Sequence, residues 1–494
     1  MNARHTHLHL SNVWGLAAVL GVVLPGCRDQ GTPTAPGAKA LAASVTPADP
    51  AGRHLVVFTA ERVPAAFADR IAQLGGTIEA ALDSIGIATA TGLSETAATQ
   101  LRAAPDIRAV EPDPMTSPRD DGEATDGLAD EAPSEAASEA AVPADATASP
   151  TAAQFYARQW NLRAVFAPDA WAAGHLGSRD VVVAILDTGI DYTNPDLAGL
   201  VDLDHSISLV PEDVTRHYPG RLPFADLFWH GTAVASAVAS NASVLAGVNR
   251  YVTLLAVKVA DSTNNHTVGR LISGIVYAAD QGADVINVSR GSERHKSQSP
   301  GTVAAFERAV NYAFRKGALV VSVPFNDATD LDHNGDIVRL PCEAANAICV
   351  SATGPTAAAG INGPWTNEDA VAPYSGFGRS AVSVAAPGGA GDVGQFRRLW
   401  VPCTGTWTQA TVPPACRNTA VPLERRVLQG LGTSWAAPHV AGLAALLVAQ
   451  LGHGNPALIR ERILQTTDDL GDPGVDPHYG RGRINVARAL GLLQ

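Results

Sequence analysis

The sequence has 494 residues, enough for two or three domains, and its hydrophobic content of 46% is ordinary for a protein with a sizeable core. The formal net charge of −13 is largely local, because nine acidic and no basic residues lie between Asp120 and Asp145. The remainder is only mildly acidic, which argues against nucleic acid as a partner.

The first 27 residues predict an export signal. Arg4 gives a weakly basic start, and residues 13–25 form an apolar run that suits a signal-peptide core but is too short to span a bilayer comfortably. The run ends in Leu24-Pro25-Gly26-Cys27, which resembles a bacterial lipoprotein processing site with Cys27 as the lipidated residue, although Pro25 departs from the usual pattern. A plain signal peptide cut nearby is the alternative. Both predict a protein that is secreted or held in the bacterial cell envelope, with a lipid anchor as its one link to a membrane.

Residues 28–50, rich in Ala, Pro, Thr and Gly, predict a flexible tether, and residues 51–114 predict a small α+β domain. Periodicity predicts strands over 54–60, 77–81, 84–91 and 107–111, and helices over 64–74 and 94–103, the first opened by Pro64 and the second capped by Ser94. The order β-α-β-β-α-β is that of a ferredoxin-like sandwich.

Residues 115–152 predict a disordered acidic linker. They consist mainly of Ala, Glu, Asp, Ser, Thr and Pro, and a segment of this composition cannot bury enough apolar surface to fold. A flexible linker between two domains is also a favourable place for proteolytic maturation.

Residues 153–494 predict an α/β domain with a largely parallel central sheet. Strongly apolar, β-branched runs at 180–186, 252–259, 285–288, 319–323 and 348–351 are typical of strands buried on both faces, and helical patterns such as 268–281 and 301–316 separate them. Ligands gather at the carboxyl ends of the strands in such folds.

Three stretches of this domain carry groups suited to nucleophilic catalysis. Asp187 follows a buried strand, His230 precedes a helix of small residues, and Ser434 opens a long apolar helix that ends near Leu451. A serine hydroxyl needs a base to remove its proton, an imidazole suits that task near neutral pH, and a buried carboxylate holds the imidazole in one tautomer. Free N–H groups at the start of the serine helix would stabilise an oxyanion.

Together, Ala184–Gly189, His230–Val238 and Gly432–Gly442 resemble the subtilisin-like (S8) serine proteases, whose chain order is Asp, His, Ser. The resemblance covers about residues 159–493 and includes landmarks at 385–388 and 480–485. It implies a three-layer fold with a largely parallel sheet, an Asp187-His230-Ser434 triad and protein or peptide substrates. It also implies that Ser289, Arg290 and Gly291 pair with the substrate backbone and that Asn326 lies in the oxyanion hole. The domain at 51–114 resembles the family's I9-type inhibitory propeptide.

The sequence departs from the family pattern around the expected site. Trp229 replaces a glycine, Trp435 replaces a methionine, and Ala233 replaces a common histidine. Phe325 adds bulk where the family's pocket for the residue before the scissile bond (P1) is lined by small residues, and predicts a narrowed pocket. Arg290 replaces an apolar residue, and either selects acidic residues further upstream or is simply solvated.

The five cysteines fit an exported protein. The spacings suggest disulfides Cys342–Cys349 and Cys403–Cys416, with Cys27 left over, although sequence alone does not fix the connectivity. Zinc binding is disfavoured because no C-x-x-C pair is present.

Catalysis by a serine protease triad requires no cofactor. The Asp-rich stretch 327–336 offers oxygen ligands for a structural calcium ion of the kind that often stabilises this family.

Two other functions compete with a secreted, self-inhibited serine endopeptidase. An α/β-hydrolase esterase needs G-x-S-x-G with its acid and histidine after the serine, whereas here both precede Ser434, so this class is rejected. A non-catalytic surface binding protein on a protease fold remains as the alternative, although an intact triad is hard to explain on that interpretation.

Overall fold

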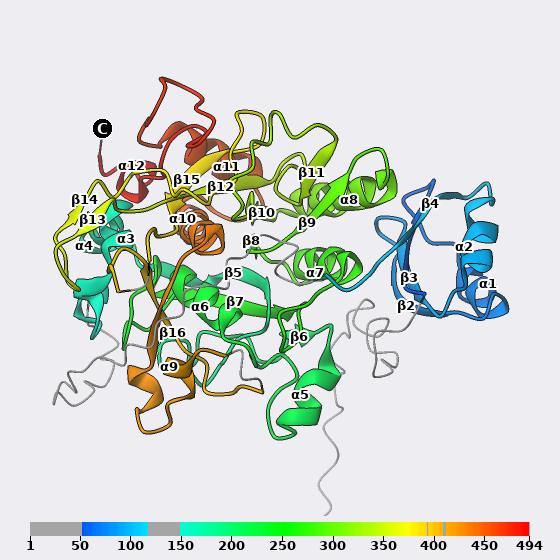
Figure 1. The fold of residues 1–494 in the computed structure, drawn as a ribbon, viewed down its shortest axis with the longest axis horizontal. Helices are drawn as coiled ribbons and strands as arrows, with labels where there is room; N and C mark the ends of the chain where they lie inside the picture. The colour runs from blue at the N-terminus through cyan, green and yellow to red at the C-terminus, as the bar shows by residue number, and fades with distance from the viewer. Residues whose placement is uncertain (1–51, 117–148, 393, 409–411, 494) are drawn as a thin grey trace, which may run out of the picture.

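The computed structural model describes residues 52–116, 149–392, 394–408 and 412–493, which form a small and a large domain packed against each other (Figure 1). The predicted export signal with Cys27, the tether over 28–50 and most of the acidic linker lie outside the described residues.

The small domain is an antiparallel four-stranded sheet with two helices, and the predicted ferredoxin-like arrangement is confirmed by its strand order β2-β3-β1-β4. Ser94 caps the second helix by accepting a hydrogen bond from the backbone N–H of Ala97 at 3.1 Å. The first helix begins three residues after Pro64, whose carbonyl accepts from the N–H of Phe67 in a turn, so the predicted helix start was wrong. The elements are β1 (His54–Phe58), α1 (Phe67–Gln73), β2 (Thr77–Leu82), β3 (Ile87–Thr91), α2 (Glu95–Arg102) and β4 (Ile107–Pro112).

The large domain is built on a seven-stranded sheet in the order β15-β12-β10-β8-β5-β7-β6, in which every neighbouring pair is parallel. The predicted parallel sheet and its buried strands are therefore confirmed, with bounds that differ by a few residues. Its strands are β5 (Gly177–Asp187), β6 (Ile207–Ser208), β7 (Tyr251–Lys258), β8 (Val285–Val288), β10 (Leu319–Ser322), β12 (Ile348–Thr353) and β15 (Val384–Pro387).

Helices and short antiparallel ribbons complete the large domain. The helices are α3 (Trp160–Ala164), α4 (Ala167–Ala172), α5 (Pro211–His217), α6 (His230–Val238), α7 (Val268–Asp280), α8 (Pro300–Lys316), α9 (Pro414–Arg417), α10 (Thr433–Leu451), α11 (Pro456–Gln465) and α12 (Val486–Ala489), with 3₁₀ turns η1 (Pro150–Ala152), η2 (Tyr156–Arg158) and η3 (Leu423–Arg425). The ribbons pair β9 (Ser292–His295) with β11 (Ile337–Leu340), β13 (Ala357–Ala358) with β14 (Trp365–Thr366), and β16 (Leu399–Pro402) with β17 (Val427–Gly430).

The alternation of side chains along β5 divides the core into two layers. Val181, Val183 and Ile185 pack with the residues of α6 and α10, whereas Ala184 and Leu186 pack with α7 and α8 on the opposite face. This period of two is what a strand buried on both faces requires.

Helix α10 is the central helix of the first layer. Among the described residues it alone is long and apolar enough to cross a membrane, but 83% of its apolar window is buried inside the protein. It is therefore a core helix, and its start lies at the carboxyl edge of the sheet.

The small domain adds a layer over α7 and α8 (Figure 1). One face of its sheet, including Leu55, Val57 and Ile87, joins the hydrophobic core that contains α7 and α8. The other face, including Val56 and Phe58, packs on α1 and α2. The sheet of the small domain is thus buried between its own helices and those of the large domain.

Candidate active site

Asp187 ends β5 and its side chain is fully buried. It lies in register with Lys258 of β7, at the carboxyl edge of the parallel sheet, where ligand-binding groups are expected. The backbone N–H of Thr188 donates to its Oδ1 at 2.7 Å. A buried charge of this kind needs strong partners.

His230 supplies one of those partners. It is the first residue of α6, and its Nδ1 lies 2.9 Å from Oδ1 and 3.0 Å from Oδ2 of Asp187. With Nδ1 facing the carboxylate, a base at this ring would use the other nitrogen, Nε2.

Asp226 fixes the start of α6 and was missed by the sequence analysis. Its buried carboxylate accepts from the N–H of Trp229 at 3.0 Å, the N–H of Thr232 at 2.9 Å and Oγ1 of Thr188 at 2.9 Å. Asp226 lies three residues before the N-cap position, Trp229, so the usual N-cap pattern does not reveal it. Asp226 thus joins the helix of His230 to the turn after Asp187.

Gly231 permits the close approach of α6 to the end of β5. A Cβ at this position would lie 2.1 Å from the carbonyl oxygen of Gly189 and 3.0 Å from Cβ of Asp187. No side chain fits there, so glycine allows His230 and Asp187 to meet.

Ser434 is the second residue of α10 and is buried. Pro438 has no N–H, so the helix offers the Ser434 carbonyl no donor four residues on. Oγ of Ser289 fills that gap by donating to the carbonyl at 2.8 Å, and Nδ2 of Asn287 donates to Oγ of Ser289 at 2.9 Å. The segment after β8, predicted to bind substrate, is therefore fastened to the backbone of Ser434.

The two tryptophans that depart from the family pattern stack on each other. Trp229, next to His230, and Trp435, next to Ser434, have ring centroids 5.8 Å apart and planes 25° apart. The ring of Trp435 also lies 5.0 Å from the imidazole of His230. The stack brings the starts of α6 and α10 side by side, which sequence alone could not show.

Trp229 adopts a backbone conformation that suits glycine. Its φ is 125°, a value that costs a side-chain-bearing residue on the order of 1–3 kcal/mol. Stacking on Trp435 and on Phe228, whose ring centroid is 5.7 Å away, offsets that cost.

One small cavity brings together most of the predicted site residues. It has a volume of about 10 Å³ and is lined by Ser289, Arg290, Val323, Phe325, Asn326, Thr433 and Ser434. Phe325 closes it, because its ring lies against Gly291, where a Cβ would be 2.9 Å from Cε1, and under the Arg339 guanidinium at 5.0 Å. A cavity of this size holds about one water molecule.

Asn326 is held in a fixed orientation by Thr433. The N–H and Oγ1 of Thr433 donate to Oδ1 of Asn326 at 2.7 and 2.9 Å. With Oδ1 committed to Thr433, Nδ2 is the donor that Asn326 offers to the cavity it shares with Ser434.

Arg290 is not solvated, contrary to one sequence-based interpretation. It is 4% exposed, and its Nη2 donates to Oδ1 of Asp187 at 2.8 Å and to Oδ1 of Asn264 at 2.7 Å. Burial raises the pKa of Asp187, but Arg290 and then His230 outweigh it and hold that pKa well below its usual range. Asp187 is therefore a carboxylate shared between the Arg290 guanidinium and the His230 imidazole.

A second histidine in α10 has a structural role. His439 is fully buried, its Nδ1 lies 2.7 Å from the carbonyl oxygen of Trp435, and its Nε2 lies 2.8 Å from Nδ2 of Asn161. Burial lowers its pKa to about 4, so it is neutral at ordinary pH.

The disulfide cysteines and the residues of the acidic stretch 327–336 are not among those that line the cavity. The structure joins Cys342 to Cys349 and Cys403 to Cys416, as the spacings suggest. Within the described residues no group of three or more His, Cys, Asp or Glu side chains is placed to hold a metal ion. In the stretch 327–336, Asp327 pairs with Arg339, Asp332 accepts from residues 379 and 380, and Asp336 accepts from Ser297.

The arrangement can perform acyl transfer. An alcohol and an imidazole–carboxylate pair start neighbouring helices, and an oriented amide donor lines the same cavity as the alcohol. Such chemistry needs groups of these types: a nucleophile, a base with an orienting group, and a donor for the oxyanion.

Comparison with known proteins agrees with this chemistry. The family model described as the subtilase family matches residues 178–482. Thermitase from Thermoactinomyces vulgaris is 31% identical over 347 residues, 68% of this chain and 97% of thermitase. The thermophilic serine proteinase of Bacillus sp. (strain AK1) is 32% identical over 321 residues, 64% of this chain and 62% of that relative.

Among solved structures, the epidermin leader peptide processing serine protease of Staphylococcus aureus matches with a TM-score of 0.64 at 20% identity. The match covers 89% of this chain and 98% of that one, a larger share of this chain than the family model matches. At this identity the likeness concerns the fold alone.

Replacing Trp229 tests the strained stack. Both Trp229→Gly and Trp229→Ala lose the ring, at a cost of about 3 kcal/mol, but glycine also relieves the positive φ. We therefore expect stability to fall in the order wild type, Gly, Ala, with Ala about 1 kcal/mol below Gly in denaturant unfolding. An alanine variant as stable as the glycine variant would contradict this account.

Proposed function

Because the chain belongs to the subtilase family and is a serine endopeptidase, we propose that it cleaves peptide bonds through an acyl-enzyme intermediate carried by Ser434. His230 is the general base and Asp187 its orienting carboxylate. The observation that carries this proposal is the pair of contacts, 2.9 and 3.0 Å, between Nδ1 of His230 and the buried carboxylate of Asp187.

In the proposed reaction, Nε2 of His230 takes the hydroxyl proton as Oγ of Ser434 attacks the carbonyl carbon of the scissile bond. Nδ2 of Asn326 and a backbone N–H at the start of α10 donate to the developing oxyanion. The imidazolium then gives its proton to the leaving amine, which departs. Water, deprotonated by His230, hydrolyses the ester and restores the serine.

We also propose that residues 51–114 form an inhibitory propeptide. Two carboxylates of the small domain cap the starts of α7 and α8. Asp113 accepts from the N–H of Gly269 at 3.1 and 3.2 Å, and Glu111 accepts from the N–H groups of Gly301 and Thr302 at 2.6 and 2.8 Å. Negative groups are stabilised at helix N-termini, which favours the Glu111 cap, whereas burial of Asp113 opposes its charge.

The end of the small domain leads toward the site. Thr116 and His266 exchange backbone hydrogen bonds of 2.8 and 3.2 Å in an antiparallel bridge. Nε2 of His266 in turn lies 3.0 Å from the carbonyl oxygen of Gly291, in the predicted substrate-binding segment. This path supports a chain that enters the cleft as substrate would, with maturation in the linker beyond Thr116.

The proposed location is outside the cytoplasm. The export-type N-terminus and two disulfides suit an oxidising compartment. Lipidation of Cys27 and a calcium ion in the stretch 327–336 stay predictions. The intact mass of the mature protein tests the first, and thermal unfolding with and without a chelator tests the second.

The nucleophile is tested by Ser434→Ala in the full chain. Wild type should react with a fluorophosphonate probe, cleave peptides and mature to a smaller form, whereas the variant should do none of these. Activity should fall by at least about 10⁴-fold, with unfolding little changed. Unaltered cleavage by the variant, or a wild type inert to the probe, would favour the non-catalytic binding protein instead.

Phe325 is expected to restrict the P1 pocket. Wild type should prefer small P1 residues, and Phe325→Gly, which also suits the local φ of 69°, should raise kcat/KM for phenylalanine over alanine at P1 by roughly 10- to 200-fold. Cleavage profiling of peptide libraries measures this ratio. Strong preference of the wild type for large aromatic P1 residues would overturn the prediction.

Propeptide binding should weaken as pH rises. Burial, opposed by Arg53 and by the N–H of Gly269, raises the pKa of Asp113 to about 6 in the docked state. Docking therefore takes up a proton, so affinity is greatest below about pH 4 and falls as pH rises through about 6, by up to roughly a hundredfold.

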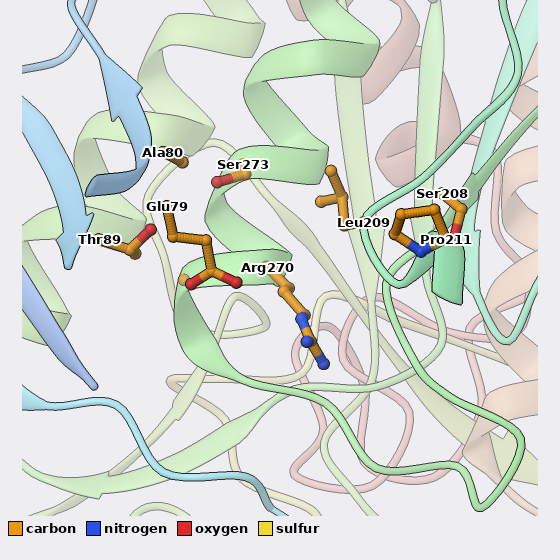
Figure 2. A pocket seen from close by; sticks show the side chains of 9 residues that line it. Glu79, Ala80, Thr89, Ser208, Leu209, Pro211, Arg270 and Ser273 are labelled. Carbon is orange, nitrogen blue, oxygen red and sulfur yellow. The ribbon is translucent and has the colours of Figure 1, made fainter. Parts of the chain in front are cut away.

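A cavity of about 50 Å³ lies in the same interface between the small and the large domain, between Glu79 of β2 and Arg270 of α7 (Figure 2).

The measurement is the Kd of domain 52–116 for a Ser434→Ala peptidase domain between about pH 4 and 8. Asp113→Asn is the matched control, and its affinity should not depend on pH over this range. Equal pH dependence in both proteins would assign the effect to another group.

A further inference from the structure

The guanidinium of Arg290 is buried in the protein beside Asp187. Arg290 lies between Ser289 and Gly291 in the segment after β8, where the backbone is expected to meet substrate. Its guanidinium is nevertheless buried, with Nη2 2.8 Å from Oδ1 of Asp187 and 2.7 Å from Oδ1 of Asn264. The Arg290 side chain therefore contacts the buried carboxylate of Asp187, although its backbone lies in the predicted substrate-binding segment.

The contact falls on an oxygen that also serves the imidazole. Oδ1 of Asp187 accepts from the N–H of Thr188 at 2.7 Å and from Arg290 at 2.8 Å, and lies 2.9 Å from Nδ1 of His230. Oδ2 lies 3.0 Å from the same Nδ1. The guanidinium and the imidazole thus share one carboxylate.

The other charged groups around Asp187 are already paired. Lys258, opposite it on β7, donates to the Thr188 carbonyl at 2.6 Å and forms an ion pair with Asp213 at 3.2 Å. Asp226 accepts from Thr188 and from the start of α6. Arg290 is therefore the cation that meets Asp187 directly, apart from His230 when protonated.

Resting on the proposed function, we propose that Arg290 is a positioning residue of the peptidase reaction, acting through Asp187. It fixes the Asp187 carboxylate and offsets its charge. Protonation of His230, which blocks catalysis, is therefore confined to acidic pH. Its backbone remains part of the predicted substrate-binding segment. One residue would thus bind substrate through its backbone and position Asp187 through its side chain.

Electrostatics sets the size of the effect. A guanidinium and an imidazolium on one carboxylate are separated by roughly 6 Å, and at the effective dielectric of a protein interior their repulsion displaces protonation of the imidazole by about one pH unit or more. The enzyme should accordingly stay active about one pH unit further into the acid range than it would with an uncharged residue at 290.

The direct test is the pH profile of kcat/KM for Arg290→Leu, Arg290→Lys and wild type, between about pH 4 and 9. The acid limb of the leucine variant should lie about one pH unit above that of wild type, with kcat lowered and KM nearly unchanged. Arg290→Lys should return the acid limb at least part of the way to its wild-type pH. Arg379→Leu is the control: it removes a 55% exposed arginine from the surface and should leave the pH of the acid limb unchanged.

Two outcomes would overturn the inference. One is an acid limb at the same pH in all four proteins. The other is a change confined to KM for peptides with acidic upstream residues, because that would make Arg290 a substrate-binding side chain.

Arg290→Gln, a polar uncharged replacement, covers the case in which the leucine variant does not fold. The midpoint of its fluorophosphonate inactivation rate against pH should lie about one pH unit above that of wild type, and an equal midpoint contradicts the inference. A protein that never reacts with the probe would refute the proposed function itself, a distinct result.

Discussion

The buried carboxylate of Asp187 is the constraint around which the large domain is organised. A charge with no solvent exposure is tolerated only where hydrogen bonds and opposite charges replace water. Thr188, His230 and Arg290 provide these from three separate segments of the chain. The carboxylate holds each of these partners in place, and the partners in turn hold the carboxylate. This mutual restraint gives the site its geometry.

The fold delivers those partners through two helix starts at one sheet edge. Helix α6 begins at His230 under the control of Asp226, and α10 begins just before Ser434, which lines the cavity. The stacked pair Trp229–Trp435 joins the two starts. The small domain uses the same physics at the starts of α7 and α8, with carboxylates from its last strand and the residue after it as caps.

Much of this was predictable from local pattern. Buried strands appear as apolar runs because both faces of a parallel sheet are covered, and the order of Asp187, His230 and Ser434 marks a family. Side-chain directions were not predictable in this way. Whether Arg290 points to solvent or to Asp187, 103 residues away, depends on packing that no local pattern encodes. The same holds for the Trp229–Trp435 stack, while Pro64 shows that a strong helix-start signal can instead form a turn.

The central claim is that Asp187 orients His230, and Asp187→Asn tests it most directly. The amide nearly preserves shape but removes the charge and can hold the wrong tautomer of the imidazole. Steady-state kinetics near neutral pH should show kcat reduced by roughly 10³- to 10⁴-fold with KM little changed. A loss of less than about tenfold in a folded variant would contradict the account.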